Sequence, residues 1–245
     1  MSYIAIGDLH GQRAALDALL AQLPLTPADV LVFLGDYVDR GPDAPGTLER
    51  LLALQQAQAQ CVFLRGNHDA MLLHFLDLVP RGDGAAYTLA CNDGLSTLKQ
   101  YGCPATLLQQ CPEEHLPPLA VRHALREYVP RAHLAFLAAT QLLYATEKYV
   151  FVHAGIRPAH ALAEQREDDL LWIRAAFLKK PHRLPQTVVY GHTPTRECGF
   201  EPRIEHAQRR IGLDTGAAYG GFLSAMVLPA EHVVRIPCRA PAAAL

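Results

Sequence analysis

Ionisable and amide side chains follow five separate apolar runs of this sequence. The five segments are GDLHG with Asp8 and His10, GDYVDRG with Asp36, Asp39 and Arg40, RGNHD with Arg65, Asn67 and His68, HAG with His153, and GHT with His192. Carboxylate, imidazole and amide groups without thiolates suit a divalent cation such as manganese, iron or zinc. These segments therefore predict a metal site.

Six of these side chains are candidate ligands, which is more than the four that one tetrahedral ion takes. They are Asp8, His10, Asp36, Asn67, His153 and His192. Two ions can share this set if one carboxylate bridges them, and pairs of ions about 3.5 to 4 Å apart are typical of phosphoryl hydrolysis. Asp36 is the expected bridge because the run before it predicts a central strand.

Two arginines near the proposed ligands indicate what kind of substrate the site binds. Arg40 and Arg65 each lie beside a proposed ligand in the sequence. A planar guanidinium can hold two oxygens of one phosphate at once. We therefore expect a dianionic phosphate as the substrate.

Each candidate also has an ordinary structural explanation when it is taken alone. Asp8 or Asp36 could cap a helix, and Asn67 could close an Asx turn. His153 and His192 could be core histidines with satisfied hydrogen bonds. The coincidence of three motifs in order, each at the end of an apolar run, makes the site the preferred interpretation.

The elements that must position these groups can be read from the apolar runs, which have strand length and are rich in β-branched or aromatic residues. The expected strands lie within residues 3–7, 30–35, 61–66, 148–155, 187–193, 210–216 and 222–228. Leucines at three- and four-residue intervals predict helices in 14–23 and 47–60. Strands alternating with helices indicate an α/β fold with parallel pairing, in which ligands bind at the carboxyl ends of the strands.

The rest of the chain differs from this pattern. Residues 71–146 predict a mostly helical insertion, and AAYGGF at 217–222 predicts a tight turn with antiparallel pairing near the carboxyl end. The closing segment, 239–245, predicts a frayed tail.

The overall composition narrows the functional classes. With 245 residues we expect a single domain spanning 1–245. Half of the residues are hydrophobic and the net charge is -2, so neither nucleic acid nor a membrane surface is favoured as a partner. The six cysteines form no CxxC pair, which predicts reduced thiols. With no leader pattern and no apolar run of spanning length, we expect a cytoplasmic protein.

The motifs GDLHG, GDYVDRG and RGNHD, followed by FVHAG, VVYGHT and LDTGAAYGG, resemble those of the calcineurin-like metallophosphoesterases over nearly the whole chain. Within them, the closest resemblance is to the phosphoprotein phosphatase branch, especially its small bacterial and phage members. Asp69 stands where the eukaryotic phosphatases of that branch have glutamate, which favours a bacterial type. Thr193-Pro194 after His192, without a further histidine two residues on, also fits that branch.

The resemblance implies a fold of two packed mixed β-sheets flanked by helices. It implies a first metal site of Asp8, His10 and Asp36, and a second of Asp36, Asn67, His153 and His192. It also assigns His68 as a catalytic acid paired with Asp39. Arg40, Arg65 and Arg174 match its phosphate-binding arginines, and Tyr219 matches a tyrosine that lines the pocket. The expected cofactors are two divalent ions, with Mn²⁺ preferred and Fe or Zn as alternatives.

The activity that follows is hydrolysis of phosphomonoesters, with phosphoserine or phosphothreonine in proteins as the preferred substrate, by direct attack of a water bridging two metal ions. The alternative is a symmetrical bis(5'-nucleosyl)-tetraphosphatase or another nucleotide phosphohydrolase acting on a small phosphorylated substrate. The pattern of that rival lacks the aspartate corresponding to Asp39, which favours phosphomonoesters. A phosphodiesterase and a catalytically silent scaffold are weaker alternatives. The sequence leaves the oligomeric state open.

Overall fold

The computed structural model describes residues 1–57, 60–79, 92–112 and 115–239. Its strands form two five-stranded sheets. The first sheet has the order β10 (His232–Pro237), β9 (Phe222–Leu228), β1 (Tyr3–Ile6), β2 (Val30–Phe33) and β3 (Cys61–Phe63). The second has the order β4 (Leu143–Ala145), β5 (Tyr149–Val152), β6 (Thr187–Tyr190), β8 (Arg210–Gly212) and β7 (Arg203–Glu205).

Both sheets are mixed: the first has antiparallel strands at one edge, and the second has them at both edges. β1, β2 and β3 run parallel, while β9 pairs antiparallel with both β1 and β10. In the second sheet β5, β6 and β8 run parallel, and β4 and β7 are antiparallel edge strands. The predicted α/β class with two packed mixed sheets is therefore confirmed.

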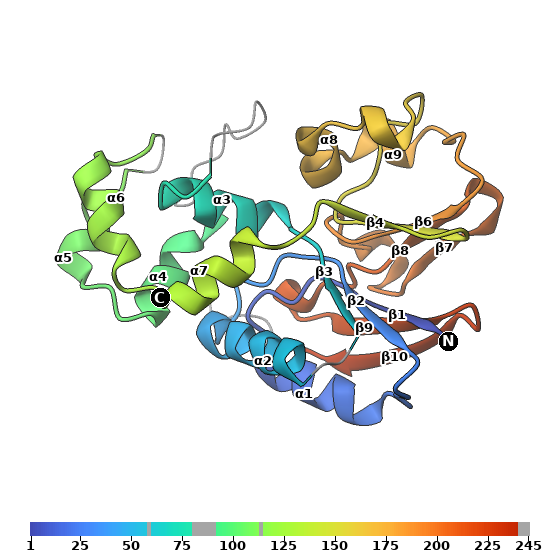
Figure 1. Ribbon diagram of the computed structural model, residues 1–245, viewed down its shortest axis with the longest axis horizontal. Coiled ribbons are helices and arrows are strands. Elements are labelled where there is room, and N and C mark those ends of the chain that lie inside the picture. Colours follow the sequence, from blue (N-terminus) through green and yellow to red (C-terminus); the bar gives the residue numbers. More distant parts are fainter. Residues whose placement is uncertain (58–59, 80–91, 113–114, 240–245) are drawn as a thin grey trace.

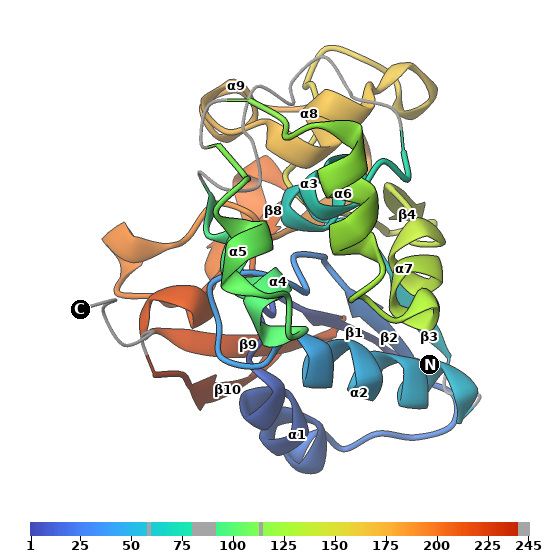
Figure 2. The ribbon, with the colours of Figure 1, turned by 90° about the vertical axis from the view of Figure 1, so that its left-hand side faces the viewer.

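Helices cover the outer faces of the two stacked sheets (Figures 1 and 2). α1 (Arg13–Gln22) and α2 (Ala44–Gln56) lie against the first sheet, while α8 (Glu167–Trp172) and α9 (Ala175–Leu178) lie on the side of the second. The remaining helices gather at one end of the molecule. They are α3 (Asn67–Phe75), α4 (Gly94–Gln100), α5 (Ala105–Leu108), α6 (Leu119–Arg126) and α7 (Arg131–Ala138).

The apolar runs are continuous because both faces of each sheet are buried, and successive side chains of a strand pack on opposite faces. On β1, Ile4 and Ile6 pack in the core with α1 and α2, whereas Ala5 packs between the sheets. On β6, Val189 packs between the sheets and Val188 packs in the core with α8 and α9. A strand alternates its side chains between two faces, and covered sheets bury both of them.

All seven predicted strands are present, but three further strands were not predicted. These are the edge strands β4, β7 and β10. β4 falls inside 71–146, where the mostly helical insertion was expected, because residues 143–145 pair with β5 after α7 has ended. β7 and β10 are harder to recognise because they lie at sheet edges and alternate apolar with charged or exposed residues.

The carboxyl-terminal turn was predicted wrongly. AAYGGF does not join two paired strands, because β8 belongs to the second sheet and β9 to the first. Residues Ala217–Tyr219 form instead a short 3₁₀ helix that carries the chain between the sheets. The antiparallel pairing expected near the carboxyl end does exist, between β9 and both β1 and β10.

Two other expectations touch the limits of the described chain. The frayed tail expected at 239–245 lies outside the described residues except for Arg239. Cysteines 61, 103, 111, 198 and 238 are free thiols, and Cys91 lies outside the described residues.

Within the described chain, no helix has the length and apolar character that crossing a membrane requires. The single-domain organisation remains a prediction.

Candidate metal centre

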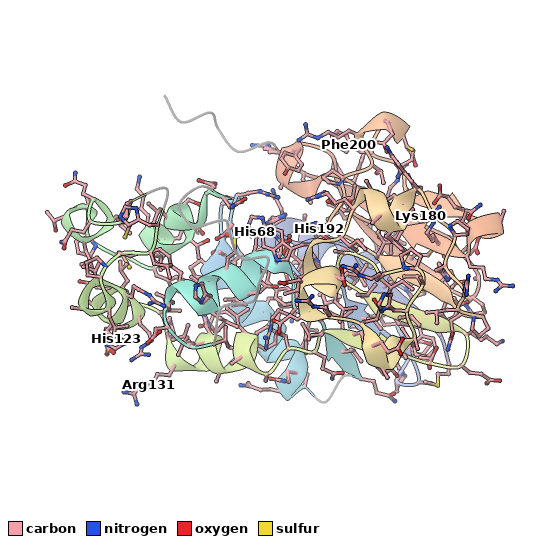
Figure 3. All side chains as sticks on the ribbon, turned by 90° about the horizontal axis from the view of Figure 1, so that it is seen from above. His68, His123, Arg131, Lys180, His192 and Phe200 are labelled. Carbon is pink, nitrogen blue, oxygen red and sulfur yellow. The ribbon has the colours of Figure 1, made fainter. Side chains whose placement is uncertain are left out.

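Five strand ends from both sheets deliver the predicted ligands to one place. Their positions follow β1, β2, β3, β5 and β6, all parallel strands within their own sheets. None of the six ligand candidates exposes more than 4% of its surface: Asp8, His10, Asp36, Asn67, His153 and His192. His68, in α3 after β3, and His192, in the turn after β6, lie near one another at the middle of the molecule (Figure 3). The strand ends therefore build one buried cluster.

Several of the predicted site residues have left-handed backbone conformations. Five predicted site residues have a positive φ, between 43° and 68°, although none is glycine: His10, Asp36, Asp39, Arg40 and His192. Left-handed conformations cost free energy for residues with a Cβ, and they concentrate at functional sites. The chain turns sharply after β1, β2 and β6, where these residues lie.

Close backbone contacts fix these turns. A Cβ on Gly66 would lie 2.2 Å from the backbone nitrogen of Asp36, and one on Gly191 would lie 2.0 Å from Oδ1 of Asp8. Asp69 accepts hydrogen bonds from the backbone N–H groups of Asp36 (2.9 Å), Tyr37 (2.9 Å) and Gly66 (2.8 Å). Asp69 therefore ties the turn after β2 to the turn after β3.

One half of the cluster brings acceptors together. His153 donates from Nδ1 to the Leu34 carbonyl at 2.8 Å, and burial lowers its pKa, so Nε2 of the neutral ring carries a lone pair. That lone pair faces Oδ1 of Asn67 at 2.9 Å and Oδ1 of Asp36 at 3.5 Å. His192 Nδ1 lies 2.8 Å from the same Asn67 oxygen.

Acceptors that face one another in a buried site repel unless a cation lies between them. Possible ligand atoms of Asp36, His153 and His192 lie within 4.8 Å of one another. Burial also lowers the pKa of His192, which keeps its ring neutral and able to coordinate. Together with Asn67, this half of the cluster fits a divalent ion.

The other half of the cluster contains an arginine. His10 donates from Nδ1 to the Val38 carbonyl at 2.9 Å, and burial lowers its pKa to about 3. Its free Nε2 faces Asp36 Oδ2 at 3.4 Å and accepts a hydrogen bond from Arg40 Nη1 at 3.0 Å. Nε2 has one lone pair, so this bond and metal ligation by the same atom exclude each other.

Crowded carboxylates point to a cation in this half as well. Burial raises the pKa of Asp8, and the carboxylates of Asp214 and Asp36 raise it further. Burial also raises the pKa of Asp214, to about 6. An opposite charge would stabilise the ionised forms of these carboxyls. Asp8, His10 and Asp36 therefore fit a second ion.

His68 and Asp39 form a buried pair beside the ligands. Nδ1 of His68 lies 2.7 Å from Oδ2 of Asp39, and Thr97 on α4 donates to the other carboxylate oxygen at 2.7 Å. A ring nitrogen of His68 is near the cluster, since possible ligand atoms of His68, His10 and Asp36 lie within 4.8 Å of one another. Asp39 therefore orients an imidazole that lies beside the site.

The predicted phosphate-binding arginines are placed differently from one another. Arg40 lies on His10, and its guanidinium carbon is 5.4 Å from the centre of the Tyr219 ring. Arg174 donates to the His192 carbonyl at 3.0 Å. Both therefore reach the cluster.

Arg65 is directed away from the ligands. Its Nη2 donates to the Ala138 carbonyl at 2.9 Å and its Nε to Thr140 Oγ1 at 3.1 Å. The cause is local, since the backbone N–H of Arg65 donates to the Gln141 carbonyl and holds the two segments side by side. No contact of the Arg65 side chain with a ligand candidate appears in the described residues.

Three residues join the site without having been assigned a role from the sequence. Asp214 follows β8 as Asp8 follows β1, so the strand-end pattern could have found it. Asp69 lies in a recognised motif but acts through backbone N–H groups. Thr97 lies on α4 in the helical segment, where nothing in the local sequence signals a role.

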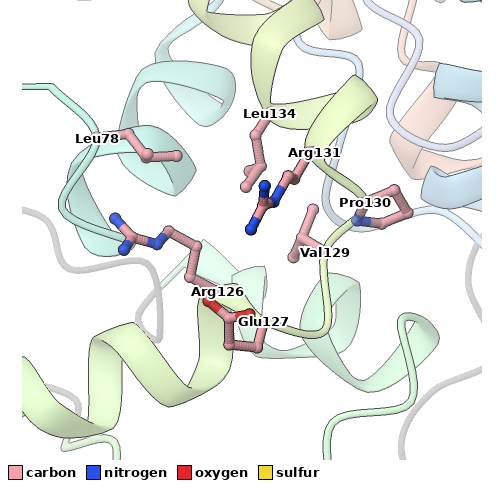
Figure 4. Close-up of a pocket in the computed structure, with 7 residues that line it drawn as sticks. All are labelled: Leu78, Arg126, Glu127, Val129, Pro130, Arg131 and Leu134. Carbon is pink, nitrogen blue, oxygen red and sulfur yellow. The ribbon is translucent and has the colours of Figure 1, made fainter.

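A separate surface hollow of about 410 Å³ lies among α3, α6 and α7 (Figure 4). Its lining consists of Leu78, Arg126, Glu127, Val129, Pro130, Arg131 and Leu134. None of the predicted site residues takes part in it, and Arg131 lies well away from His68 and His192 (Figure 3). The metal centre and this hollow are therefore distinct.

Comparison with known proteins supports the same chemistry. The asymmetrical bis(5'-nucleosyl)-tetraphosphatase PrpE of Halalkalibacterium halodurans is 27% identical, with 98% of this chain and 96% of that protein covered. A solved structure provisionally described as a diadenosine tetraphosphatase is 26% identical with a TM-score of 0.65, covering 97% of this chain and 93% of the other. A cold-active protein-tyrosine phosphatase of Shewanella, 17% identical with a TM-score of 0.53, covers 96% and 77% and shares the fold.

A family model described as calcineurin-like phosphoesterase matches residues 1–216. That match includes all the ligand candidates, and members of the family use a centre of two metal ions. The chain belongs to the calcineurin-like phosphoesterase family and is a hydrolase of that family.

Proposed function

We propose that this protein hydrolyses nucleotide polyphosphates of the bis(5'-nucleosyl)-tetraphosphate class in a metal-dependent reaction. The observation that carries the metal dependence is that His153 Nε2, an acceptor, faces two further acceptors, Oδ1 of Asn67 and Oδ1 of Asp36. His192 Nδ1 lies on the same Asn67 oxygen. The nucleotide class rests on the relatives, whose names specify this substrate. These relatives are named as asymmetrical enzymes, so they favour asymmetrical cleavage over the symmetrical cleavage considered from the sequence.

The six ligand candidates would hold two divalent ions, with Asp36 shared between them. Mn²⁺ is the preferred ion, with iron or zinc as alternatives, since oxygen and nitrogen ligands are mixed and thiolates are absent. Bound ions supply a water of lowered pKa and stabilise charge on the phosphate that is attacked. The chain must supply the ligands, the substrate contacts and the proton.

The protein residues act on the substrate side. His68 is assigned as the proton donor to the leaving oxygen, with its ring held by Asp39. The carboxylate of Asp39 is held in turn by Thr97. Arg40, once its bond to His10 is replaced by metal ligation, is free to bind phosphate oxygens. Arg174 is a second phosphate contact in this assignment.

A second candidate is hydrolysis of phosphomonoesters such as phosphoserine or phosphothreonine in proteins, the substrate first preferred from the sequence. The 2.7 Å contact between His68 and Asp39 favours it. An alkoxide is a poor leaving group, and protonation by a positioned acid accelerates such reactions by about 10² to 10⁴-fold. A nucleotide leaving group needs this acid less.

Parallel rate measurements separate the two candidates. With Mn²⁺ present, we expect kcat/KM for diadenosine tetraphosphate to exceed that for phosphoserine, phosphothreonine and phosphotyrosine peptides. The products of asymmetrical cleavage are ATP and AMP, whereas two ADP molecules indicate symmetrical cleavage. Faster turnover of a phosphopeptide than of diadenosine tetraphosphate would overturn the nucleotide assignment in favour of the second candidate.

A further inference from the structure

Beyond the predicted residues, an exposed arginine stands beside the site. We propose that Arg196 and Tyr219 form a subsite that binds the phosphates of a polyphosphate chain beyond the one attacked at the metal centre. The proposal rests on the proposed function, because it names how the same site selects a chain of phosphates over a single one.

Three side chains lead outward from the ligand cluster. Arg40 Nη1 lies 3.0 Å from His10 Nε2. The guanidinium carbon of Arg40 is 5.4 Å from the centre of the Tyr219 ring, and that of Arg196 is 4.2 Å from the same centre. Both distances lie within the range of a cation–π contact. Tyr219 therefore connects a guanidinium on the cluster with one at the surface.

Neither guanidinium of this group forms a direct ion pair within the part of the chain that the structure describes. Among the residues that the structure describes, no carboxylate forms an ion pair with Arg40 or Arg196. Glu197, the neighbour of Arg196, pairs with Arg203 instead. Two cations near one ring repel each other, and an anion that bridges them would remove this repulsion.

Contacts of neighbouring residues hold the segments that carry Arg196 and Tyr219. The residue before it, Thr195, donates its N–H to the Asp214 carbonyl at 2.9 Å. Phe200 closes the segment by packing on Gly216, where a Cβ would lie 2.3 Å from the ring. Gln12 donates to the Ala217 carbonyl at 3.1 Å and holds the 3₁₀ helix that carries Tyr219. These contacts hold the chain segments that carry Arg196 and Tyr219.

The chemistry of the group selects phosphate over a nucleobase. A guanidinium offers paired donors that match two oxygens of a phosphate. The Tyr219 ring is already covered by a guanidinium at 4.2 Å, which leaves less of its face for a base. Arg40 contacts His10 of the ligand cluster, whereas Arg196 contacts the Tyr219 ring, so we assign Arg40 to the phosphate at the metal ions and Arg196 to the next phosphates of a chain.

Calorimetric titration can test the subsite without turnover. The probes are methylenediphosphonate, a non-hydrolysable diphosphate analogue with two phosphonate groups, and methylphosphonate, which has one. Each is added to Mn²⁺-loaded protein. We expect Arg196→Ala to weaken methylenediphosphonate binding about tenfold, a typical effect of losing one charged contact. Methylphosphonate binding should change several-fold less, and Arg196→Lys should restore part of the loss.

The matched control is Arg131→Ala, which removes an exposed arginine far from the site. Three results would each overturn the subsite: no loss in Arg196→Ala, equal losses for both probes, or the same loss in Arg131→Ala. Turnover of diadenosine tetraphosphate by the wild-type protein tests the proposed function separately. A protein that prefers phosphopeptides could still bind the two-phosphate probe through Arg196, so the two failures remain distinguishable.

Discussion

The ligand cluster and the arginines around it are held in place in different ways. The ligands are buried at strand ends, and several bind one another or the backbone of a neighbouring strand. The arginines are more exposed and take their contacts from different elements. Arg40 lies on His10, Arg65 on the last residue of α7, Arg174 on the His192 carbonyl, and Arg196 on Tyr219.

This difference separates two properties of the enzyme. The cluster is determined by the two sheets, so its metal chemistry follows from the fold. The arginines depend on loops and on the helical segment, which vary more easily than strand ends. We therefore expect the cluster to determine whether a phosphate is hydrolysed, and the arginines to determine which phosphate compound is hydrolysed.

Loss of the shared ligand should have the largest effect. Asp36 lies between both halves of the cluster, 3.4 Å from His10 and 3.5 Å from His153. We expect Asp36→Asn to lower kcat/KM for every substrate by about 10⁴-fold, because metal ions contribute several kcal/mol to such reactions. Steady-state rates with metal analysis test this, with Asp17→Asn as the control. A substrate-selective loss would contradict a role common to all substrates.

Replacement of the proposed acid should affect substrates unequally. For His68→Asn we expect a loss of about 10² to 10³-fold on a phosphoserine peptide, whose leaving group needs a proton. The loss on p-nitrophenyl phosphate should be smaller because its leaving group is a stable anion. Single-turnover rates measure both. Equal losses would mean that His68 acts on the metal cluster rather than on the leaving group.

The arginines should divide into a binding group and a structural group. Arg40→Ala should lower kcat/KM by about 10- to 100-fold with little change in the midpoint of thermal unfolding. Arg65→Ala removes the side-chain donor to the Ala138 carbonyl and to Thr140 Oγ1. It should lower the free energy of unfolding by about 1 to 3 kcal/mol. A larger loss of kcat/KM in Arg65→Ala than in Arg40→Ala would restore the phosphate role predicted from the sequence.

The sequence could predict the cluster because its signals are local. Asp8, Asp36 and His153 each follow an apolar strand, and parallel strands end at a common edge. It could not predict that the hydrogen bonds of Arg65 would be taken by Ala138 and Thr140, more than seventy residues away. Such a contact depends on the packing of the end of α7 beside β3, and the local sequence of neither segment predicts that packing.

The helical segment illustrates the same limit. Thr97 contributes to the site only because α4 packs beside the turn that carries Asp39. The edge strand β4 was missed because its three residues continue an apolar pattern that also suits a helix. Long-range packing, rather than local preference, decides both outcomes.

Acidification should have a smaller effect that tests the crowded carboxylates. Their raised pKa values, about 6 for Asp214, mean that protons compete with metal ions until the pH exceeds that value. The lowered pKa of His10, about 3, keeps its imidazole free throughout this range. Affinity for Mn²⁺ should therefore fall as the pH drops from 7 to 5, by up to about tenfold per unit for each proton displaced. For Asp214→Asn, the affinity for Mn²⁺ should depend less on pH. An unchanged pH dependence would exclude protonation of Asp214 as its cause.

Metal binding itself tests the central claim most directly. Metal-stripped protein should be titrated calorimetrically with Mn²⁺ at pH 7.5, alongside Asp36→Asn and the surface control Asp17→Asn. The cluster predicts two ions per chain for the wild-type protein and the control, and weakened binding of both ions in Asp36→Asn. A wild-type protein that binds no Mn²⁺, or an Asp36→Asn variant that binds two ions as tightly as the wild-type protein, would contradict the assignment.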